Sequence, residues 1–131
     1  VGVDADGAMI EVARERDDTT RFVHADLATL TLTGQAFDVI VLAGNVVPFL
    51  ADGTLVDVLR RLRAHLTTDG RLVCGWALPG HQPPGAAAVD ADDVDRAAFA
   101  ADLSLVVRYS SWDRDPWPGD GSWALTVHRP R

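Results

Sequence analysis

The chain has 131 residues, with 19 acidic and 12 basic side chains and a formal net charge of -7. Every basic residue is an arginine, and the absence of lysine excludes chemistries that need one, such as Schiff-base formation or phosphate binding by a P-loop lysine. Net negative charge without a basic run argues against binding to nucleic acid or to an anionic membrane. Because 47% of the residues are hydrophobic, we expect a folded single domain over residues 1–131.

The first part of the chain alternates strand and helix patterns. Residues 1–4 resemble the second half of a strand, and Asp6 is placed to cap a helix over residues 6–16. A short strand is expected over residues 21–25. Residues 37–43 form an almost continuous apolar run, which is typical of a parallel strand buried on both faces.

The same alternation continues after residue 50. A strong amphipathic helix is expected over residues 54–66, followed by a turn at residues 67–70 and a strand over residues 71–76. This strand and helix order predicts an α/β fold with parallel strands and with helices on both faces of the sheet.

The last part of the chain has a different character. Residues 78–85 (LPGHQPPG) form a Pro/Gly-rich loop, and a helix is expected over residues 90–101 with Asp90 as its cap. Two alternating segments, residues 103–112 and 122–129, are separated by turn residues, which predicts a C-terminal antiparallel hairpin.

Ligands in open α/β sheets bind outside the carboxyl ends of the strands, so the residues just after each expected strand are informative. Asp4 ends the first strand, and a carboxylate there can accept hydrogen bonds from both hydroxyls of a ribose; the alternative is a capping or solvated residue. Asp26 follows the second strand. Residues 43–45 (AGN) follow the third, where small residues let a ligand approach the backbone.

Several segments in series resemble the class I S-adenosylmethionine-dependent methyltransferases. They are VGVDADGAMIEVAR, FVHADLATL, FDVIVLAGNVVPFL and LRRLRAHLTTDGRLVCGW, and the tail RYSSWDRDPWPGDGSWALTVHR is similar to the final hairpin of small bacterial members of that family. The resemblance implies a Rossmann-like sheet, mostly parallel with a C-terminal antiparallel hairpin. It also implies S-adenosylmethionine as cofactor, with S-adenosylhomocysteine as product.

The resemblance assigns roles to individual positions. Asp4 would accept hydrogen bonds from the ribose hydroxyls, and Asp26 would accept one from the adenine amino group. The other residues implied to contact the cofactor are Ala5, Asp6 and Met9 at the adenosine edge, Leu27 in the adenine slot, and Ala43, Gly44 and Asn45 beneath the methionine arm and facing the acceptor. An equally good interpretation of Met9, compatible with the first, is that its side chain packs in the core.

One family feature has no counterpart in residues 1–131. The strand, glycine-rich loop and helix that the family places before the strand ending at Asp4 are missing, and that strand is by resemblance the central one of the sheet. The strands ending at Asp4 and at Ala43 would then share no neighbour, which leaves two free edges. We therefore expect an N-terminally incomplete domain, or a chain that closes its sheet directly or pairs its edges with another copy.

The implied reaction is in-line displacement of the activated methyl group by a small-molecule acceptor, which depends mainly on proximity and alignment. His81, in the Pro/Gly loop, is the first candidate for a general base, and its alternative reading is a plain loop residue. The scattered histidines and the single Cys74 have no metal-ligand spacing, so no metal is predicted.

Two other functions stay open at this point. The chain could be a non-catalytic remnant that assembles through open sheet edges, or a fragment of a dehydrogenase, which the missing lysine and the terminal hairpin disfavour. A lone cysteine fits the reducing cytoplasm, and neither a nucleic-acid nor a membrane partner is expected.

Overall fold

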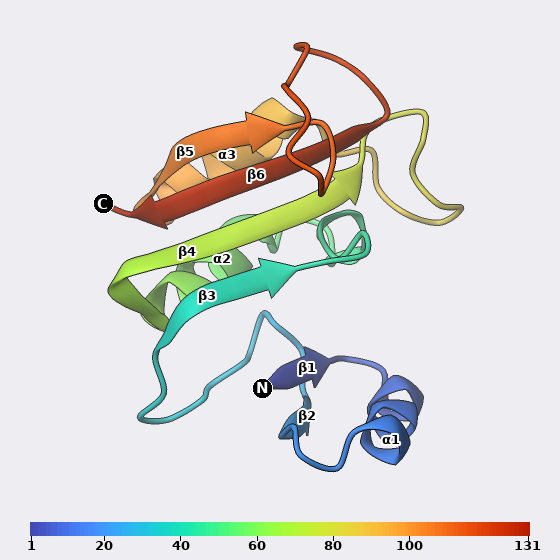
Figure 1. The fold of residues 1–131 in the computed structure, drawn as a ribbon, viewed down its shortest axis with the longest axis vertical. Coiled ribbons are helices and arrows are strands. Elements are labelled where there is room, and N and C mark those ends of the chain that lie inside the picture. The colour runs from blue at the N-terminus through green and yellow to red at the C-terminus, as the bar shows by residue number, and fades with distance from the viewer.

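Two separate β-sheets organise the computed structural model, which describes all 131 residues (Figure 1). The elements in chain order are β1 (Gly2–Asp4), α1 (Gly7–Arg16), β2 (Phe22–His24), β3 (Phe37–Leu42), the 3-10 helix η1 (Val47–Phe49), α2 (Leu55–Ala64), β4 (Leu66–Ala77), α3 (Ala91–Ala100), β5 (Leu103–Tyr109) and β6 (Trp123–Pro130). Strands β1 and β2 pair in parallel, and the second sheet has the order β3-β4-β6-β5. The β3–β4 pair is parallel and the other two pairs are antiparallel, which confirms the expected mixed sheet with its C-terminal hairpin.

The helices begin where the sequence pattern predicts. The side chain of Asp6 accepts a hydrogen bond from the Ala8 N–H at 2.8 Å and so caps α1. Helix α3 begins with a capping box in which Asp90 and Asp93 each accept from the other's backbone N–H. No helix is both long enough and apolar enough to cross a bilayer.

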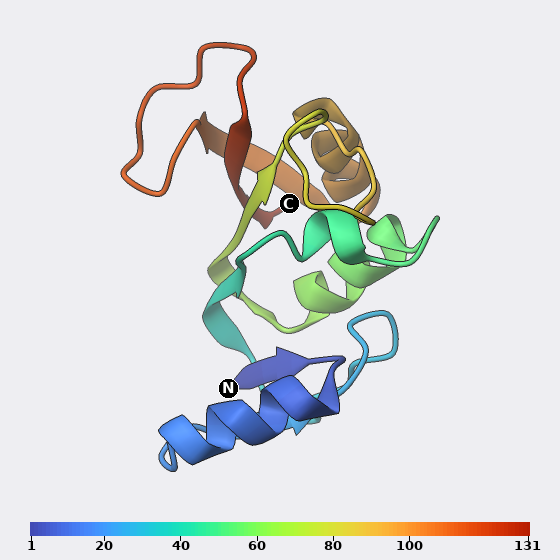
Figure 2. The same ribbon diagram turned by 90° about the vertical axis from the view of Figure 1, so that its right-hand side faces the viewer.

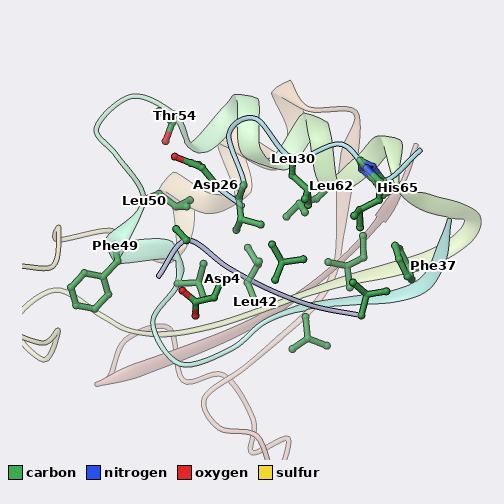
Figure 3. A pocket seen from close by; sticks show the side chains of 18 of the residues that line it. Asp4, Asp26, Leu30, Phe37, Leu42, Phe49, Leu50, Thr54, Leu62 and His65 are labelled. Atoms are coloured by element: carbon green, nitrogen blue, oxygen red, sulfur yellow. The ribbon is translucent and has the colours of Figure 1, made fainter. Parts of the chain in front are cut away.

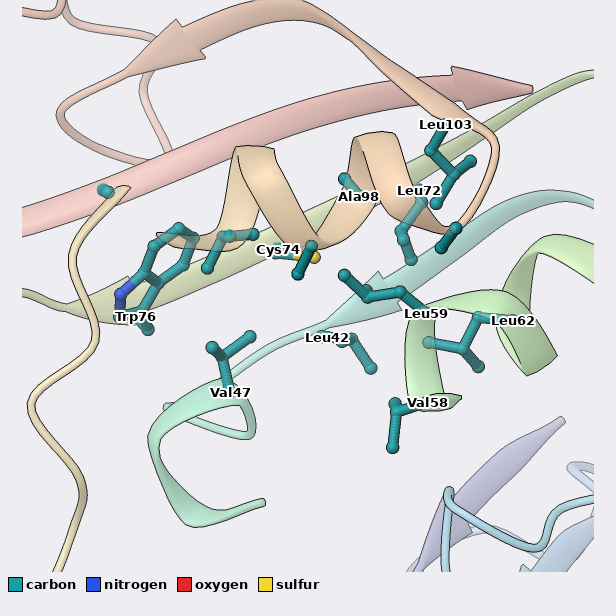
Figure 4. Close-up of a cluster of buried hydrophobic side chains, with 14 of the residues drawn as sticks. Leu42, Val47, Val58, Leu59, Leu62, Leu72, Cys74, Trp76, Ala98 and Leu103 are labelled. Atoms are coloured by element: carbon teal, nitrogen blue, oxygen red, sulfur yellow. The ribbon is translucent and has the colours of Figure 1, made fainter. Parts of the chain in front are cut away.

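The hydrophobic core lies between the four-stranded sheet and helices α2 and α3 (Figure 4). Leu72, Cys74 and Trp76 alternate along β4 and are fully buried against the helices. The Trp76 indole N–H donates to the Val89 carbonyl oxygen at 2.9 Å, so its one polar atom is satisfied. Burial raises the pKa of the Cys74 thiol to about 12, which makes this residue a core side chain and not a nucleophile.

The expected turn at residues 67–70 is wrong, because β4 begins at Leu66 and runs through this segment. Leu66 pairs with Phe37 of β3, and the register then shifts before Val39 pairs with Arg71. Gly70 is buried at this irregularity, where an added Cβ would lie 3.0 Å from the Phe37 carbonyl oxygen. Pairing with β3 thus makes residues 67–70 part of an irregular strand, although their sequence favours a turn. Local propensity cannot predict this, because the pairing is a tertiary contact.

The expectation that residues 37–43 are buried on both faces is also wrong. The side chains of Val39 and Val41 are 56% and 49% exposed. Figure 2 shows α2 and α3 together on one side of the four-stranded sheet, with no helix on the other side. The expected helices on both faces are therefore not found for this sheet, and α1 packs beside β1 and β2 instead.

The two free strand edges that the sequence predicts are present. Strand β1 pairs only with β2, and β3 pairs only with β4, so each has one edge without a strand partner. The sheet has not closed by direct pairing of β1 with β3. An unpaired edge exposes backbone N–H and C=O groups, which makes this the least complete part of the fold.

A partly buried network of hydrogen bonds and ion pairs fastens α3 to the hairpin. The His128 side chain is 1% exposed, and its Nε2 donates to Asp95 Oδ1 at 2.9 Å, while Arg108 bridges Asp95 and Asp92. Burial opposes ionisation of Asp95, but hydrogen bonds from His128 and Arg108 outweigh it, and they hold the pKa of this carboxyl below its ordinary value. The arrangement keeps α3 on the face of β5 and β6.

We expect Asp95→Asn to lower the free energy of unfolding at neutral pH by about 2–3 kcal/mol, because it leaves buried donors of His128 and Arg108 poorly matched. Since the pKa of Asp95 is lower in the folded state than in the unfolded chain, its contribution is complete above about pH 4 and is lost as the pH falls through the folded-state pKa. Urea unfolding at a series of pH values should therefore show a shallower acid decline in Asp95→Asn. Asp102→Asn, which breaks an exposed pair with Arg131, is the control and should cost little; equal effects of the two substitutions would contradict the assignment.

Asn45 joins the end of β3 to the end of β4. Its backbone lies in the left-handed region at φ 69°, directly after Gly44 at φ 71°. Its side-chain Oδ1 accepts a hydrogen bond from the Ala77 N–H at 2.7 Å. Asparagine tolerates this backbone region better than most residues, so one side chain provides both the turn and the cross-strand link.

Three substitutions at Asn45 separate these contributions. Asn45→Gly keeps the backbone freedom but leaves the Ala77 N–H without its acceptor, and should lower the free energy of unfolding by about 1 kcal/mol. Asn45→Ala also introduces backbone strain and should cost about 2 kcal/mol, whereas Asn45→Asp keeps an oxygen acceptor and should stay closest to the unsubstituted protein. The three are compared by urea unfolding, and a glycine variant as stable as the original chain would show that the hydrogen bond contributes nothing.

Candidate functional site

A cleft of about 730 Å³ lies between the two sheets and contains both free strand edges. Its volume is in the range that holds a small organic ligand or cofactor. Most of its lining is apolar and comes from β1, β3, the segment after β2, the segment around η1 that precedes α2, and the C-terminal end of α2. The lining residues are Val1, Val3, Asp4, Ala5, Asp26, Leu27, Leu30, Leu32, Phe37, Val39, Ile40, Val41, Leu42, Gly44, Val46, Phe49, Leu50, Ala51, Thr54, Leu62 and His65.

Two carboxylates lie at one end of this cleft. Figure 3 shows Asp4 and Asp26 at the end that Phe49 and Leu50 also occupy, while Phe37 and His65 lie at the other end. Asp4 ends β1 and Asp26 follows β2, and these neighbouring parallel strands bring their carboxyl ends to the same edge. The sequence places these residues 22 positions apart, and strand pairing brings them to one site.

Each carboxylate uses one oxygen within its own loop. Asp4 Oδ1 accepts from the Asp6 N–H at 2.8 Å, and Asp26 Oδ1 accepts from the Ala28 N–H at 2.8 Å. These bonds hold each side chain in a turn and leave Oδ2 without a protein partner. An exposed carboxylate oxygen beside an apolar slot can accept a hydrogen bond from a ligand hydroxyl or amino group.

The structure brings together some of the residues predicted to bind the cofactor. Asp4, Ala5, Asp26, Leu27 and Gly44 all line the cleft.

Other predicted site residues do not line the cleft. Asp6 is occupied in capping α1, and the Met9 side chain is 56% exposed, which makes the core reading of Met9 wrong. Ala43 is exposed, and the Asn45 amide oxygen is turned toward β4. His81 lies in an exposed turn where its backbone N–H donates to the Leu78 carbonyl oxygen.

The segment before α2 forms a wall of the cleft that was not among the predicted site residues. Val46, Phe49, Leu50 and Thr54 line the cleft from η1 and the loop after it. The available signal was the apolar run VVPFL directly after a strand, because hydrophobic residues in a connecting loop often mark a binding surface.

His65 lines the far end of the cleft but serves as a structural link. Its Nε2 accepts from the Leu32 N–H at 3.0 Å, and its Nδ1 lies 2.8 Å from the Arg61 carbonyl oxygen. Accepting at one nitrogen and donating at the other requires the neutral ring with its proton on Nδ1. Both nitrogens are used, so His65 ties the segment after β2 to α2 and has no free nitrogen for catalysis.

The charge of the lining suits the hydroxyl and amino groups of a nucleoside-containing ligand better than an anionic group. Asp4, Asp26 and His65 are the only ionisable side chains that line the cleft, and no arginine reaches it. The carboxylate end can bind hydroxyl and amino groups. An anionic group such as an amino-acid carboxylate finds no cationic side chain among these residues.

Comparison with known proteins agrees with this arrangement. The methyltransferase domain family model matches residues 1–70. A TehB-like SAM-dependent methyltransferase from Corynebacterium glutamicum is 29% identical with a TM-score of 0.86, over 99% of this chain and 67% of that one. The CcbJ methyltransferase from Streptomyces caelestis is 17% identical with a TM-score of 0.86, over 98% and 73%. The sugar N-methyltransferase KedS8 from a Streptoalloteichus species is 20% identical with a TM-score of 0.79, over 99% and 70%.

A comparison with curated proteins finds no match. The family match covers more than half of the chain and includes β1, β2 and β3, the elements that carry Asp4, Asp26 and the wall of the cleft. The structural likeness extends over the remaining strands and helices. The chain belongs to the methyltransferase domain family.

Proposed function

We propose that the protein transfers the methyl group of S-adenosylmethionine to a small-molecule acceptor by in-line displacement. The observation that carries this proposal is the pair of free carboxylate oxygens on Asp4 and Asp26, set at one end of an apolar cleft between parallel strands. That pattern is suited to a nucleoside, since the ribose and the base offer hydroxyl and amino donors on an apolar body.

The residues present fit the nucleoside part of the cofactor. Asp4 Oδ2 is available to accept from the ribose hydroxyls, and Asp26 Oδ2 from the adenine amino group. Leu27 and Leu50 line the cleft and offer apolar surface for a flat base. Gly44, with φ 71° and open space where a Cβ would be, leaves room for the arm that carries the methyl group.

The cofactor supplies a methyl group already activated on a sulfonium, with a neutral thioether as its leaving group. The chain's contribution is to bind the nucleoside, exclude water with the apolar wall and hold the acceptor in line. Asp6, Met9, Ala43 and Asn45 do not line the cleft. In our proposal Asp6 and Asn45 act through the helix cap and the turn that they stabilise beside the cleft residues Ala5 and Gly44. His81 stays our proposed general base, although its loop does not line the cleft, and it would take the proton that the acceptor loses as the new bond forms.

We expect Asp4→Asn to weaken binding of S-adenosylhomocysteine roughly tenfold, because a neutral amide replaces a charged acceptor of the ribose hydroxyls. Asp26→Asn should weaken it by a similar factor through the adenine amino group. The matched control is Asp18→Asn, an exposed aspartate in the turn after α1 that does not line the cleft. Isothermal titration measures all three, and an affinity unchanged in Asp4→Asn would remove Asp4 from the ribose site.

We also propose that one further strand, parallel to β1 and β3, occupies the inner part of the cleft. Three observations support it: both edges are free, both strands run parallel to their existing neighbours, and Val39 and Val41 expose apolar side chains there. Inserting one strand would satisfy both rows of backbone groups at once. The lack of a cationic side chain at the cleft suggests that the same segment binds the amino-acid end of the cofactor.

The domain proposed here is therefore N-terminally incomplete within residues 1–131. We expect the 131-residue chain to bind S-adenosylhomocysteine at least about tenfold more weakly than the same chain extended by the residues encoded before Val1, since the anionic end would gain its partners. Isothermal titration of both polypeptides tests this, and equal affinities would contradict it.

Sedimentation velocity tests the alternative, in which the chain is a non-catalytic remnant that assembles through its edges. Concentration-dependent association of the 131-residue chain that Val41→Lys abolishes would favour a homo-oligomer, because the lysine would place a charge in the apolar contact. Absence of cofactor binding in either polypeptide would favour the remnant.

The acceptor class rests on the relatives. KedS8 is a sugar N-methyltransferase, and a glycopeptide N-methyltransferase, MtfA, also shares the fold. These names support a small molecule over a nucleic acid, in agreement with the net charge of -7. The cytoplasmic location rests on the single cysteine and stays a prediction.

A further inference from the structure

The loop from Asp4 to Ala8 is held by a hydrogen bond that the proposed function does not use. The His24 ring, at the end of β2, has its Nε2 2.9 Å from the Ala5 carbonyl oxygen. His24 is also the strand partner of Asp4 in the parallel β1–β2 pair. A carbonyl oxygen can only accept, so the proton of this bond is carried by Nε2.

This carbonyl belongs to the same peptide unit as the N–H that orients Asp4. The unit joins Ala5 to Asp6: its C=O accepts from His24, and its N–H donates to Asp4 Oδ1 at 2.8 Å. Because a peptide unit is planar and rigid, fixing the oxygen at one end fixes the direction of the N–H at the other. The imidazole thereby determines where the Asp4 carboxylate is held.

Two glycines make room for the side chains of β2. A Cβ added at Gly7 would lie 3.2 Å from the His24 ring, and one added at Gly2 would lie 2.6 Å from the Phe22 ring. Phe22 and His24 point to the same face of β2, because they are two residues apart in a strand. Gly2 in β1 thus leaves room for the Phe22 ring, and Gly7 at the start of α1 leaves room for the His24 ring.

We propose that His24 is a positioning residue for the ribose-binding carboxylate of Asp4. This rests on the proposed function, in which Asp4 Oδ2 receives the ribose hydroxyls. His24 directs Oδ1 of that carboxylate to the Asp6 N–H, which leaves Oδ2 without a protein partner in a residue that lines the cleft. The ring does not line the cleft, and it acts only through the Ala5–Asp6 peptide.

Three variants separate this role from simple packing. His24→Met fills a similar volume without a donor, whereas His24→Gln places an amide N–H near the position of Nε2. The control is Arg14→Met, which removes a 3.0 Å hydrogen bond to the Phe22 carbonyl in the same β1–α1–β2 unit without touching the loop.

The binding readout is the preference of the protein for adenosine over 2′,3′-dideoxyadenosine, measured by isothermal titration on the longest polypeptide that binds. We expect His24→Met to reduce this preference roughly three- to tenfold, the size of one hydrogen bond, and His24→Gln to restore most of it. Arg14→Met should leave the preference unchanged. An unchanged preference in His24→Met, or no recovery in His24→Gln, would overturn the proposal.

A second measurement does not need a ligand. Amide hydrogen exchange of Asp6 and Ala8 reports the two N–H groups that the loop holds, and it should accelerate about three- to tenfold in His24→Met but not in Arg14→Met. If the unsubstituted protein does not prefer adenosine over 2′,3′-dideoxyadenosine, the role proposed for Asp4 is wrong. The amide exchange rates of Asp6 and Ala8 then remain as the test of whether His24 positions the loop. Unchanged exchange in His24→Met would overturn the positioning role in that case too.

Discussion

Backbone groups along a parallel strand need partners on both sides, and β1 and β3 have partners on one side only. The rest of the molecule is arranged around that constraint. The two sheets are not paired with each other, apolar side chains line the cleft between them, and the carboxyl ends of the strands bring Asp4 and Asp26 to one end of that cleft. The proposed further strand and the nucleoside would occupy different parts of this cleft, with the nucleoside at the end that holds Asp4 and Asp26.

The two halves of the protein are stabilised in different ways. The four-stranded sheet has a continuous core against α2 and α3, and its C-terminal part is fastened by the network around Asp95. The β1–α1–β2 unit buries one helix residue, Ile10, and depends on local bonds such as those of Arg14 and His24. Fewer buried contacts make this half the easier one to open, and it carries both proposed nucleoside-binding carboxylates.

Much of the site was predictable from the positions of residues relative to strand ends. Asp4, Asp26 and Gly44 follow apolar runs, and the carboxyl ends of parallel strands meet at one edge, so these residues line a common cleft. Met9 failed as a core residue because its helical stripe has little to pack against. Phe49 and Leu50 were missed because loop residues carry no periodic pattern that places them.

The sequence by itself determined the element order, the helix caps at Asp6 and Asp90 and the antiparallel hairpin, because these follow from local patterns and turn chemistry. The free edges of β1 and β3 were expected only through the family resemblance. Only the tertiary structure decided that β4 extends through the residues expected to form a turn before Arg71, that one face of β3 is exposed and that His24 bonds to the Ala5 carbonyl. Those outcomes depend on which surfaces meet across long sequence separations. No window of neighbouring residues contains that information.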